Sequence, residues 1–173
     1  MKLPKQERHI INNYELKKNI FRLINLFTGF SGILNDSQGY IEDFKTSKLF
    51  NDYSYFFEEE FSKLILEIAI NARVLDDSIK AHNGKKDLNV FNGIEMMGII
   101  DEDIFYSPRE AINKIIHADY VSHDIRHDDT NPYYMPSLQV IGNKGKNQWL
   151  GEIFLLPLCK VLYDFACEND LPK

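Results

Sequence analysis

The clearest pattern along the chain is a repeat of apolar residues at helical spacing. Between Tyr55 and His82, apolar side chains recur every three or four residues, and Asn83-Gly84 follows as an expected C-terminal stop. The sequence therefore predicts a long helix over Tyr55–His82 with one apolar face turned to the core. That face consists of Phe57, Phe61, Leu64, Ile65, Ile68, Ala72, Leu75 and Ile79.

Weaker helical patterns lie near both ends of the chain. One covers about residues 5–27 and is followed by Gly29, which we expect to break it. The other covers about residues 156–169, with Pro157 in its first turn, where proline is tolerated. The segment 41–55 is ambiguous between a short helix and irregular structure.

Alternating apolar and polar residues predict a β-hairpin over about 137–154, because two such runs flank the turn signal NKGKN. The segment 87–103 has no helical stripe, and we expect a short strand or an irregular arm there. The stretch DYVSHDIRHDDTNPYYMP, residues 119–136, is rich in Asp and ends in proline. We therefore expect a loop in that stretch.

Together these elements predict a single domain over residues 1–173 of the mainly α class. The expected architecture is a helical bundle with the hairpin of about 137–154 inserted before the C-terminal helix. The chain is long enough to bury a core, and its 44% hydrophobic and 13% aromatic content excludes a disordered protein. We find no internal repeat, low-complexity tract or interdomain linker.

The charge of the chain argues against a tight, sequence-independent nucleic-acid binder. The formal net charge is −6, and the densest basic positions are only Lys144, Lys146 and the pair Lys85-Lys86. An enzyme that meets RNA briefly, or one that acts with a basic partner, remains compatible with this balance.

The cysteines and the first residues predict a cytoplasmic protein. Cys159 and Cys167 fall about two turns apart in the predicted C-terminal helix, too far to form a disulfide. Glu7 and Arg8 stand where a signal peptide needs an apolar run. No stretch of about 18 apolar residues exists, so we expect no membrane contact.

A capping box marks the start of a further helix, over about 108–118. Ser107 can cap the first turn, Pro108 suits the first helical position, and Glu110 completes the pattern Ser-x-x-Glu. The isoleucines of this helix should face the core and pack against the apolar face of the long helix. The expected contacts join Phe61, Ile68 and Leu75 with Ile112, Ile115 and Ile116.

The other side of this helix carries Arg109, Asn113 and His117, which step by four and form one polar stripe. Such a stripe can hold a phosphate or move a proton, and it can equally be a solvated face. Arg109, at the second helical position, is expected to be exposed. Arg73 of the long helix has two interpretations: an ion pair with Asp77 at i+4, or a side chain that faces the polar stripe.

Three histidines gather in the segment 117–129, which is also rich in Asp. His117, His123 and His127 are suitable zinc ligands, but the chain has no HExxH motif and no cysteine pair with metal-ligand spacing. We therefore expect an exposed loop without metal, and a metal-dependent hydrolase is the alternative. The stretch GNKGKN lacks the spacing of a nucleotide-binding loop, and a serine-nucleophile motif is absent.

The sequence NKIIHA at 113–118 resembles the motif of the HEPN (higher eukaryotes and prokaryotes nucleotide-binding) family, in which an Arg, often followed by Asn, precedes a His. The resemblance implies a helical bundle that dimerises across its motif helices. It also implies metal-independent RNA cleavage without any cofactor, often within toxin–antitoxin or antiviral defence systems. The partners so implied are RNA and either a second copy of the chain or a protein from the same operon.

The match departs from the family at Ile112, which stands where the family has Arg. Arg109 lies on the same stripe and can substitute, as can Arg73 or Arg126 from elsewhere, with Lys114 as a further binding residue. In the role that the resemblance implies, His117 transfers a proton, Asn113 fixes the ring or a phosphate oxygen, and an Arg stabilises the phosphorane. The alternative is a non-catalytic interaction module that keeps the fold and has lost the cation.

Overall fold

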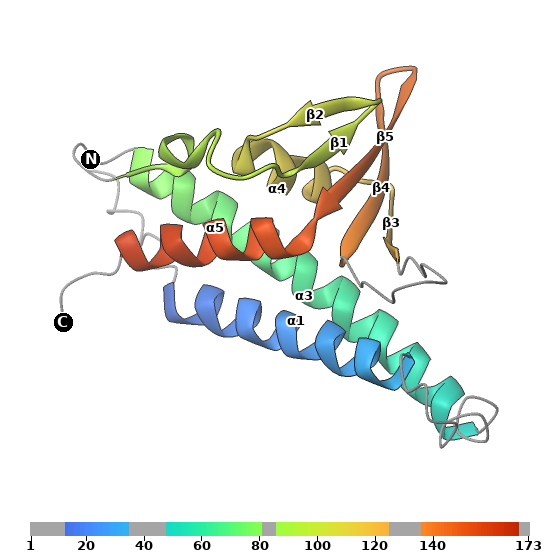
Figure 1. Ribbon diagram of the computed structural model, residues 1–173. Helices are drawn as coiled ribbons and strands as arrows, with labels where there is room; N and C mark the ends of the chain where they lie inside the picture. Colours follow the sequence, from blue (N-terminus) through green and yellow to red (C-terminus); the bar gives the residue numbers. More distant parts are fainter. Residues whose placement is uncertain (1–12, 35–47, 81–85, 125–135, 170–173) are drawn as a thin grey trace, which may run out of the picture.

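The computed structural model describes residues 13–34, 48–80, 86–124 and 136–169. These residues form four α-helices, one short 3-10 helix and a five-stranded sheet (Figure 1). α5 lies in front of α3 and above α1, and the sheet stands at one end of this helical layer. The elements are α1 (Asn13–Leu34), α3 (Lys48–Lys80), the 3-10 helix η1 (Leu88–Phe91), β1 (Gly98–Ile100), β2 (Asp103–Phe105), α4 (Pro108–Ile116), β3 (Tyr120–Asp124), β4 (Ser137–Lys144), β5 (Asn147–Phe154) and α5 (Leu155–Glu168).

The sheet is antiparallel throughout, with strand order β2-β1-β5-β4-β3. Its centre is the β4–β5 hairpin, whose register runs from Ser137 opposite Phe154 to Lys144 opposite Asn147. Gly145, in the turn, has a φ of +66°, a conformation that glycine adopts without steric cost. The hairpin predicted at about 137–154 is therefore confirmed, with the same bounds.

The predicted fold class, a mainly α helical bundle with one inserted hairpin, is wrong. The hairpin is the middle of a five-stranded sheet, to which β1 and β2 add one edge and β3 the other. β1 and β2 have three residues each, too few to show an alternating pattern. β3 lies in the stretch predicted to be a loop, and it turns Val121 and His123 toward the inner face beside Val140 and Leu138.

Helix boundaries also differ from the prediction, and α4 ends at Ile116, two residues before the expected end. α1 continues to Leu34, so Gly29 lies inside the helix and does not end it. A glycine in a helix interior costs only about 1 kcal/mol, and the buried rings of Phe27 and Phe30 hold this part of α1 against the core. α3 begins at Lys48, so the described part of the ambiguous segment 41–55 is helical.

The buried side chains form one hydrophobic cluster that draws on all four α-helices and on the sheet. Phe61, Ile68 and Leu75 of α3 are buried, and α3 packs against α4 as predicted. Ile112 and Ile115 are buried in the same cluster, whereas Ile116 is only partly buried at its margin. Among the described helices, none is both long and apolar enough to cross a membrane.

Candidate functional site

The N-terminus of α4 is fixed by the cap that the sequence predicts. Ser107 has an extended backbone, and its Oγ accepts a hydrogen bond from the Glu110 N–H at 3.2 Å, with Pro108 in the first turn. The helix ends at Ile116, and His117 is its C-cap, with the His117 N–H donating to the Asn113 carbonyl at 3.0 Å. His117 therefore stands at the end of α4 and not inside the helix.

Arg73 of α3 crosses to the polar stripe of α4. Its Nη1 donates a hydrogen bond to Oδ1 of Asn113, and its Nε donates to Oδ2 of Asp77 at 3.0 Å. Both interpretations of Arg73 are thus confirmed, because one guanidinium makes the i+4 ion pair and also faces the stripe. The Arg73 side chain is 34% exposed, so part of this side chain remains open to solvent.

Arg109 is held by the two adjacent aspartates of α3. It pairs with Asp76 through Nη1, and its Nη2 lies 2.6 Å from Oδ1 of Asp77. The Arg109 side chain is only 15% exposed, so the prediction of an exposed Arg109 is wrong. Because α3 places two carboxylates opposite the first turn of α4, Arg109 joins the two helices and does not project into solvent.

Asp76 is the centre of this network and is fully buried. Besides Arg109, its carboxylate forms an ion pair with Nζ of Lys80 at 2.9 Å and accepts a hydrogen bond from the Leu88 N–H at 2.7 Å. Each contact satisfies an oxygen that would otherwise be desolvated without a partner. Asp76 therefore ties together α3, α4 and the start of η1.

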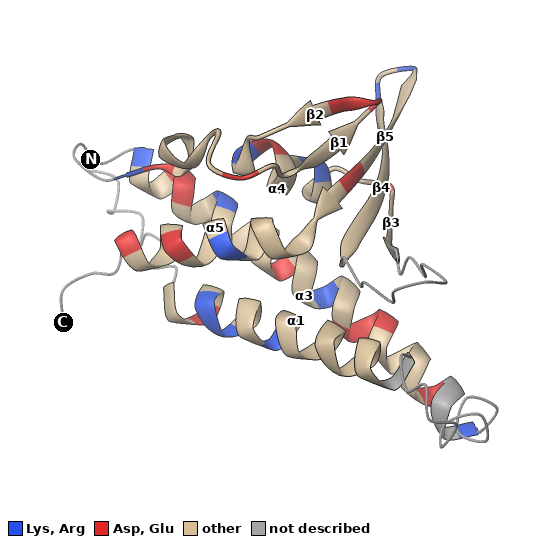
Figure 2. Ribbon diagram, in the orientation of Figure 1, with Lys and Arg blue, Asp and Glu red and all other residues tan. Residues whose placement is uncertain are grey.

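The charges around Asp77 favour its ionised form. Burial by itself raises the pKa of this carboxyl, but hydrogen bonds and charges from Arg109 and Arg73 outweigh it and hold the pKa below its ordinary value. Asp77 is thus a carboxylate shared between two guanidiniums. Figure 2 shows the corresponding basic and acidic positions along α3 and α4.

His117 is the exposed member of the stripe. Within the part of the chain that the structure describes, no side chain forms a hydrogen bond or ion pair with its imidazole. An exposed imidazole can accept or donate a proton in an acid–base step. The stripe therefore presents an exposed imidazole one turn beyond an asparagine that is bonded to an arginine.

Lys114 and Trp149 meet beside this stripe. Lys114 Nζ lies 4.0 Å from the centroid of the Trp149 ring, a cation–π contact. Under the ring is Gly142, where an added Cβ would come within 2.2 Å of Trp149 Cζ2. The hairpin thus holds the indole against α4. Arg126, a predicted binding residue, lies outside the described residues.

His123, a predicted metal ligand in the alternative hypothesis, points into an aromatic cluster. Its ring makes edge contacts with Phe30, Phe57 and Phe61. Its Nδ1 lies 3.0 Å from Glu58 Oε1 without hydrogen-bond geometry. Residues 13–34, 48–80, 86–124 and 136–169 contain no group of three side chains placed to hold a metal ion. His127 lies outside these ranges.

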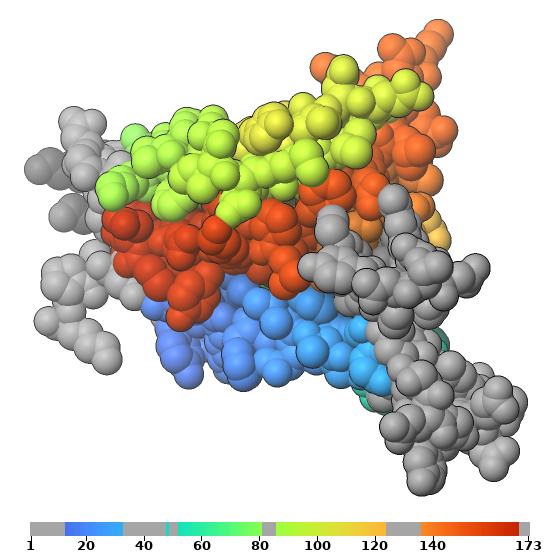
Figure 3. All heavy atoms as spheres, viewed as in Figure 1, coloured from blue at the N-terminus to red at the C-terminus, as the bar shows by residue number. Residues whose placement is uncertain are grey.

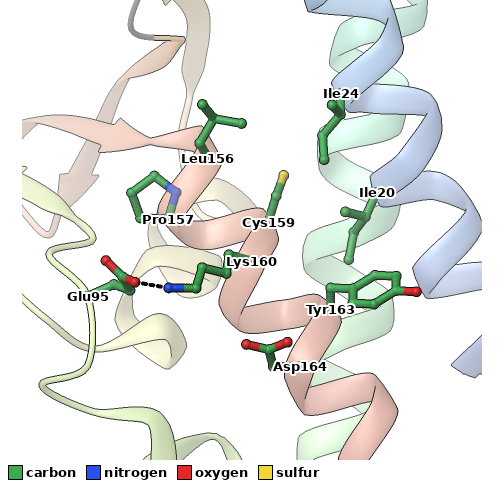
Figure 4. A pocket seen from close by; sticks show the side chains of 9 residues that line it. All are labelled: Ile20, Ile24, Glu95, Leu156, Pro157, Cys159, Lys160, Tyr163 and Asp164. Atoms are coloured by element: carbon green, nitrogen blue, oxygen red, sulfur yellow. Dashed lines mark hydrogen bonds and ion pairs between the residues drawn. The ribbon is translucent and has the colours of Figure 1, made fainter.

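A separate apolar hollow of about 480 Å³ lies between α1 and α5, and Figure 4 shows the side chains around it. Figure 3 shows α5 on this front surface, between α1 and the segment that precedes α4. The Lys160 ammonium reaches across to Glu95, which raises the pKa of Lys160. Burial raises the pKa of the Cys159 thiol to about 12, so this thiol is not a nucleophile near neutral pH.

Sequence reasoning missed Asp76 as a partner of Arg109, and it missed Lys80 as a second cation beside Asp76. A signal was present, because Asp76 falls one turn after Ala72 on the apolar face of the long helix. A carboxylate on such a face needs a buried cation or a donor. Asp76 therefore predicts a neighbouring basic residue, although not which one.

No family model matches this chain, and neither a curated protein nor a solved structure shows significant similarity to it.

Proposed function

We propose that the protein is an RNA-directed, HEPN-like ribonuclease component of a defence or toxin–antitoxin system, acting in the cytoplasm. The observation that carries the proposal is the bond between Arg73 and Asn113. The motif-like stretch lacks an arginine at Ile112, and α3 supplies a guanidinium to the same stripe from another element. One turn further along, His117 is exposed.

The chemistry follows from what these three side chains can do. In the proposed reaction the ribose 2′-oxygen attacks the adjacent phosphorus, and the P–O5′ bond breaks. His117 takes the 2′-hydroxyl proton or supplies the proton of the 5′-hydroxyl that leaves. Arg73 stabilises the charge on the phosphorane, and Asn113 orients the Arg73 guanidinium. The nucleophile belongs to the substrate, so no metal ion or other cofactor is needed.

The open part of Arg73 is what makes this role feasible. Its Nε and Nη1 have acceptors in Asp77 and Asn113, whereas Nη2 has no acceptor among the described residues. A phosphate oxygen that approached from solvent would find this donor already oriented by the other two bonds. Lys114, beside Trp149, adds a second positive charge near the stripe.

The experiment that tests this proposal is RNA cleavage by the purified protein in the presence of EDTA. We expect products with 2′,3′-cyclic phosphate and 5′-hydroxyl ends. The assay should use the protein alone and also together with the products of adjacent genes. A complete lack of cleavage in both settings would refute the ribonuclease role.

We also propose that the active form is a homodimer built on α3. Leu66, Ile70 and Val74 are 44%, 43% and 39% exposed, and they form an apolar stripe beside Arg73. If two copies of α3 pack antiparallel about Ile70, Leu66 meets Val74 and Lys63 meets Asp77. Ile70→Asp should then give a monomer in sedimentation, with an unchanged circular dichroism spectrum.

The second proposed function is a non-catalytic interaction module, which one observation favours. Both arginines beside Asn113 are already paired with Asp76 or Asp77, so their charges are largely balanced within the protein. In this case the stripe from Asn113 to His117 is a contact surface for a protein from the same operon. A folded wild-type protein that binds such a partner through His117 and cuts no RNA would establish this function.

A further inference from the structure

The outer face of the sheet, turned away from the helices, is unusually apolar for a surface. The register places Ile104, Ile99, Glu152, Gln139 and Ser122 in one row across all five strands. The next row across three strands is Leu150, Ile141 and Tyr120. The opposite face carries Leu138, Val140 and Ile153, which are fully buried. The two faces of the sheet are therefore clearly distinct.

Large side chains on the outer face are open to solvent. Ile104, Leu150 and Tyr120 are 54%, 56% and 58% exposed, and Ile99 and Ile141 are partly exposed. In the described part of the chain, the helices pack on the inner face and leave these side chains uncovered (Figure 1). Adjacent exposed apolar residues on one face, as opposed to scattered ones, are typical of an interaction surface.

The same face is acidic, and it is hollowed. A shallow depression of about 580 Å³ is lined by Ile99 and Leu150 together with the carboxylates Asp101, Glu102 and Glu152, and no Lys or Arg lines it. Figure 2 shows the acidic positions at the β1–β2 turn and on β5. The basic residues of the hairpin, Lys144 and Lys146, belong to its tip and lie outside the lining.

The β1–β2 turn is attached to this face by two hydrogen bonds. The Asp101 N–H donates to the Leu150 carbonyl at 2.9 Å, and the Leu150 N–H donates to Asp101 Oδ1 at 3.0 Å. Asp101 and Glu102 hold φ values of +49° and +74°, in the left-handed region. The turn therefore keeps the Glu102 carboxylate at the rim of the depression.

We propose that this outer sheet face, centred on Ile99, Leu150 and Glu102, binds a basic segment of a partner protein that also presents aliphatic side chains. Aliphatic groups of the partner would cover Ile99 and Leu150, and its Lys or Arg would meet the rim carboxylates. A basic segment is favoured because its charge is complementary to the carboxylates that line the depression. RNA is repelled by the carboxylates, and a second copy of this chain would bring the same acids against one another.

The test is selection of peptides that bind the full chain, from a phage-displayed library of random peptides. We expect the binders to be enriched in Lys or Arg together with Val, Ile or Leu. Their binding should fall at least about tenfold with Glu102→Lys and with Leu150→Ser. Raised salt should weaken the wild-type interaction, because exposed charge pairs are screened.

Two control variants separate this face from general effects of charge and exposure. Glu59→Lys reverses an exposed charge on α3, and Val90→Ser removes an apolar side chain that is 55% exposed in η1, close to the 56% of Leu150. Both should bind the selected peptides like the wild type.

Acidic or neutral binders, or binders indifferent to Glu102→Lys and Leu150→Ser, would overturn the proposal. A change of oligomeric mass in Leu150→Ser would also overturn it, because the occupant would then be a second copy. RNA cleavage does not enter these readouts, so the result is independent of the ribonuclease proposal.

Discussion

Arg73 and Asn113, forty residues apart in the chain, are joined by a hydrogen bond from the guanidinium Nη1 to the amide Oδ1. This bond links α3 to α4. One turn before Asn113, Arg109 of α4 forms ion pairs with Asp76 and Asp77 of α3 and so also joins the two helices. Beyond Asn113, at the C-terminal end of α4, lies the exposed His117. Arg109 therefore has a structural role between the two helices, whereas His117 is open to solvent.

Because Arg109 pairs with the buried Asp76 and with Asp77, we expect Arg109→Ala to be strongly destabilising. Removing this guanidinium leaves the fully buried Asp76 with Lys80 as its remaining cation, and such a loss costs about 3 kcal/mol in the free energy of unfolding. Arg22→Ala is the matched control, since its pair with Glu60 is 44% and 35% exposed and should contribute less than about 1 kcal/mol. Chemical denaturation measures both, and equal costs would contradict this assignment.

The seam between α3 and α4 predicts unequal costs for neighbouring isoleucines. Ile112 is fully buried, so Ile112→Ala should lower the free energy of unfolding by about 2–5 kcal/mol. Ile116 is only partly buried, and Ile116→Ala should cost about 1 kcal/mol, because less area leaves water on folding. Urea denaturation of the two variants compares them directly. A larger cost at Ile116 would show that α4 is rotated from the position described.

The lowered pKa of Asp77 predicts a defined loss of stability in acid. A carboxylate whose pKa falls on folding stabilises the protein above its unfolded pKa, about 4, and this contribution disappears as pH falls through the folded value. Since the Asp77 side chain is 52% exposed, the contribution should be about 1 kcal/mol or less. The gap in unfolding free energy between wild type and Asp77→Asn should be constant near neutral pH and narrow below about pH 4. If the difference in unfolding free energy grew as the pH fell, it would contradict the lowered pKa of Asp77.

Spacing along the chain was sufficient to predict the long helix, the capped helix and the hairpin. Each of these has enough residues for its period to show, and Ser107 and Glu110 mark a helix start by themselves. β1 and β2 are too short for that, and β3 carries Ser, His and Asp, which favour a loop prediction. The five-stranded sheet arises from pairing between distant segments, and local pattern does not specify such pairing.

Of the predicted polar stripe, Arg109 and Asn113 lie on α4 and contact α3, whereas His117 is the C-cap beyond the last helical residue. A step of four places Arg109 and Asn113 on one side of the helix, but it says nothing about which element faces that side. The element that faces this side is α3. Its Asp76 and Asp77 contact Arg109, and its Arg73 contacts Asn113. As a result Arg109 is paired and mostly covered, and Arg73 takes the place beside Asn113.

The segment 117–129 predicts a metal content well below one ion per chain. His123 is turned into the aromatic cluster of Phe30, Phe57 and Phe61, so it does not point to solvent with His117. Elemental analysis for zinc, nickel and iron measures the content, and a chelator should leave the melting temperature unchanged. A stoichiometric metal that stabilises the fold would instead favour the metal-dependent hydrolase.

The most direct test of the central claim is the rate of RNA cleavage in EDTA by Arg73→Gln, compared with wild type and with Arg22→Gln. The account predicts that wild type and Arg22→Gln cut at the same rate. Arg73→Gln and His117→Asn should lose about a hundredfold or more, because a group that stabilises charge in the transition state is removed or a proton carrier is lost. Melting temperatures measured alongside show whether each variant is folded. Wild-type protein that cuts no RNA, or a folded Arg73→Gln variant that cuts as fast as wild type, would contradict the account.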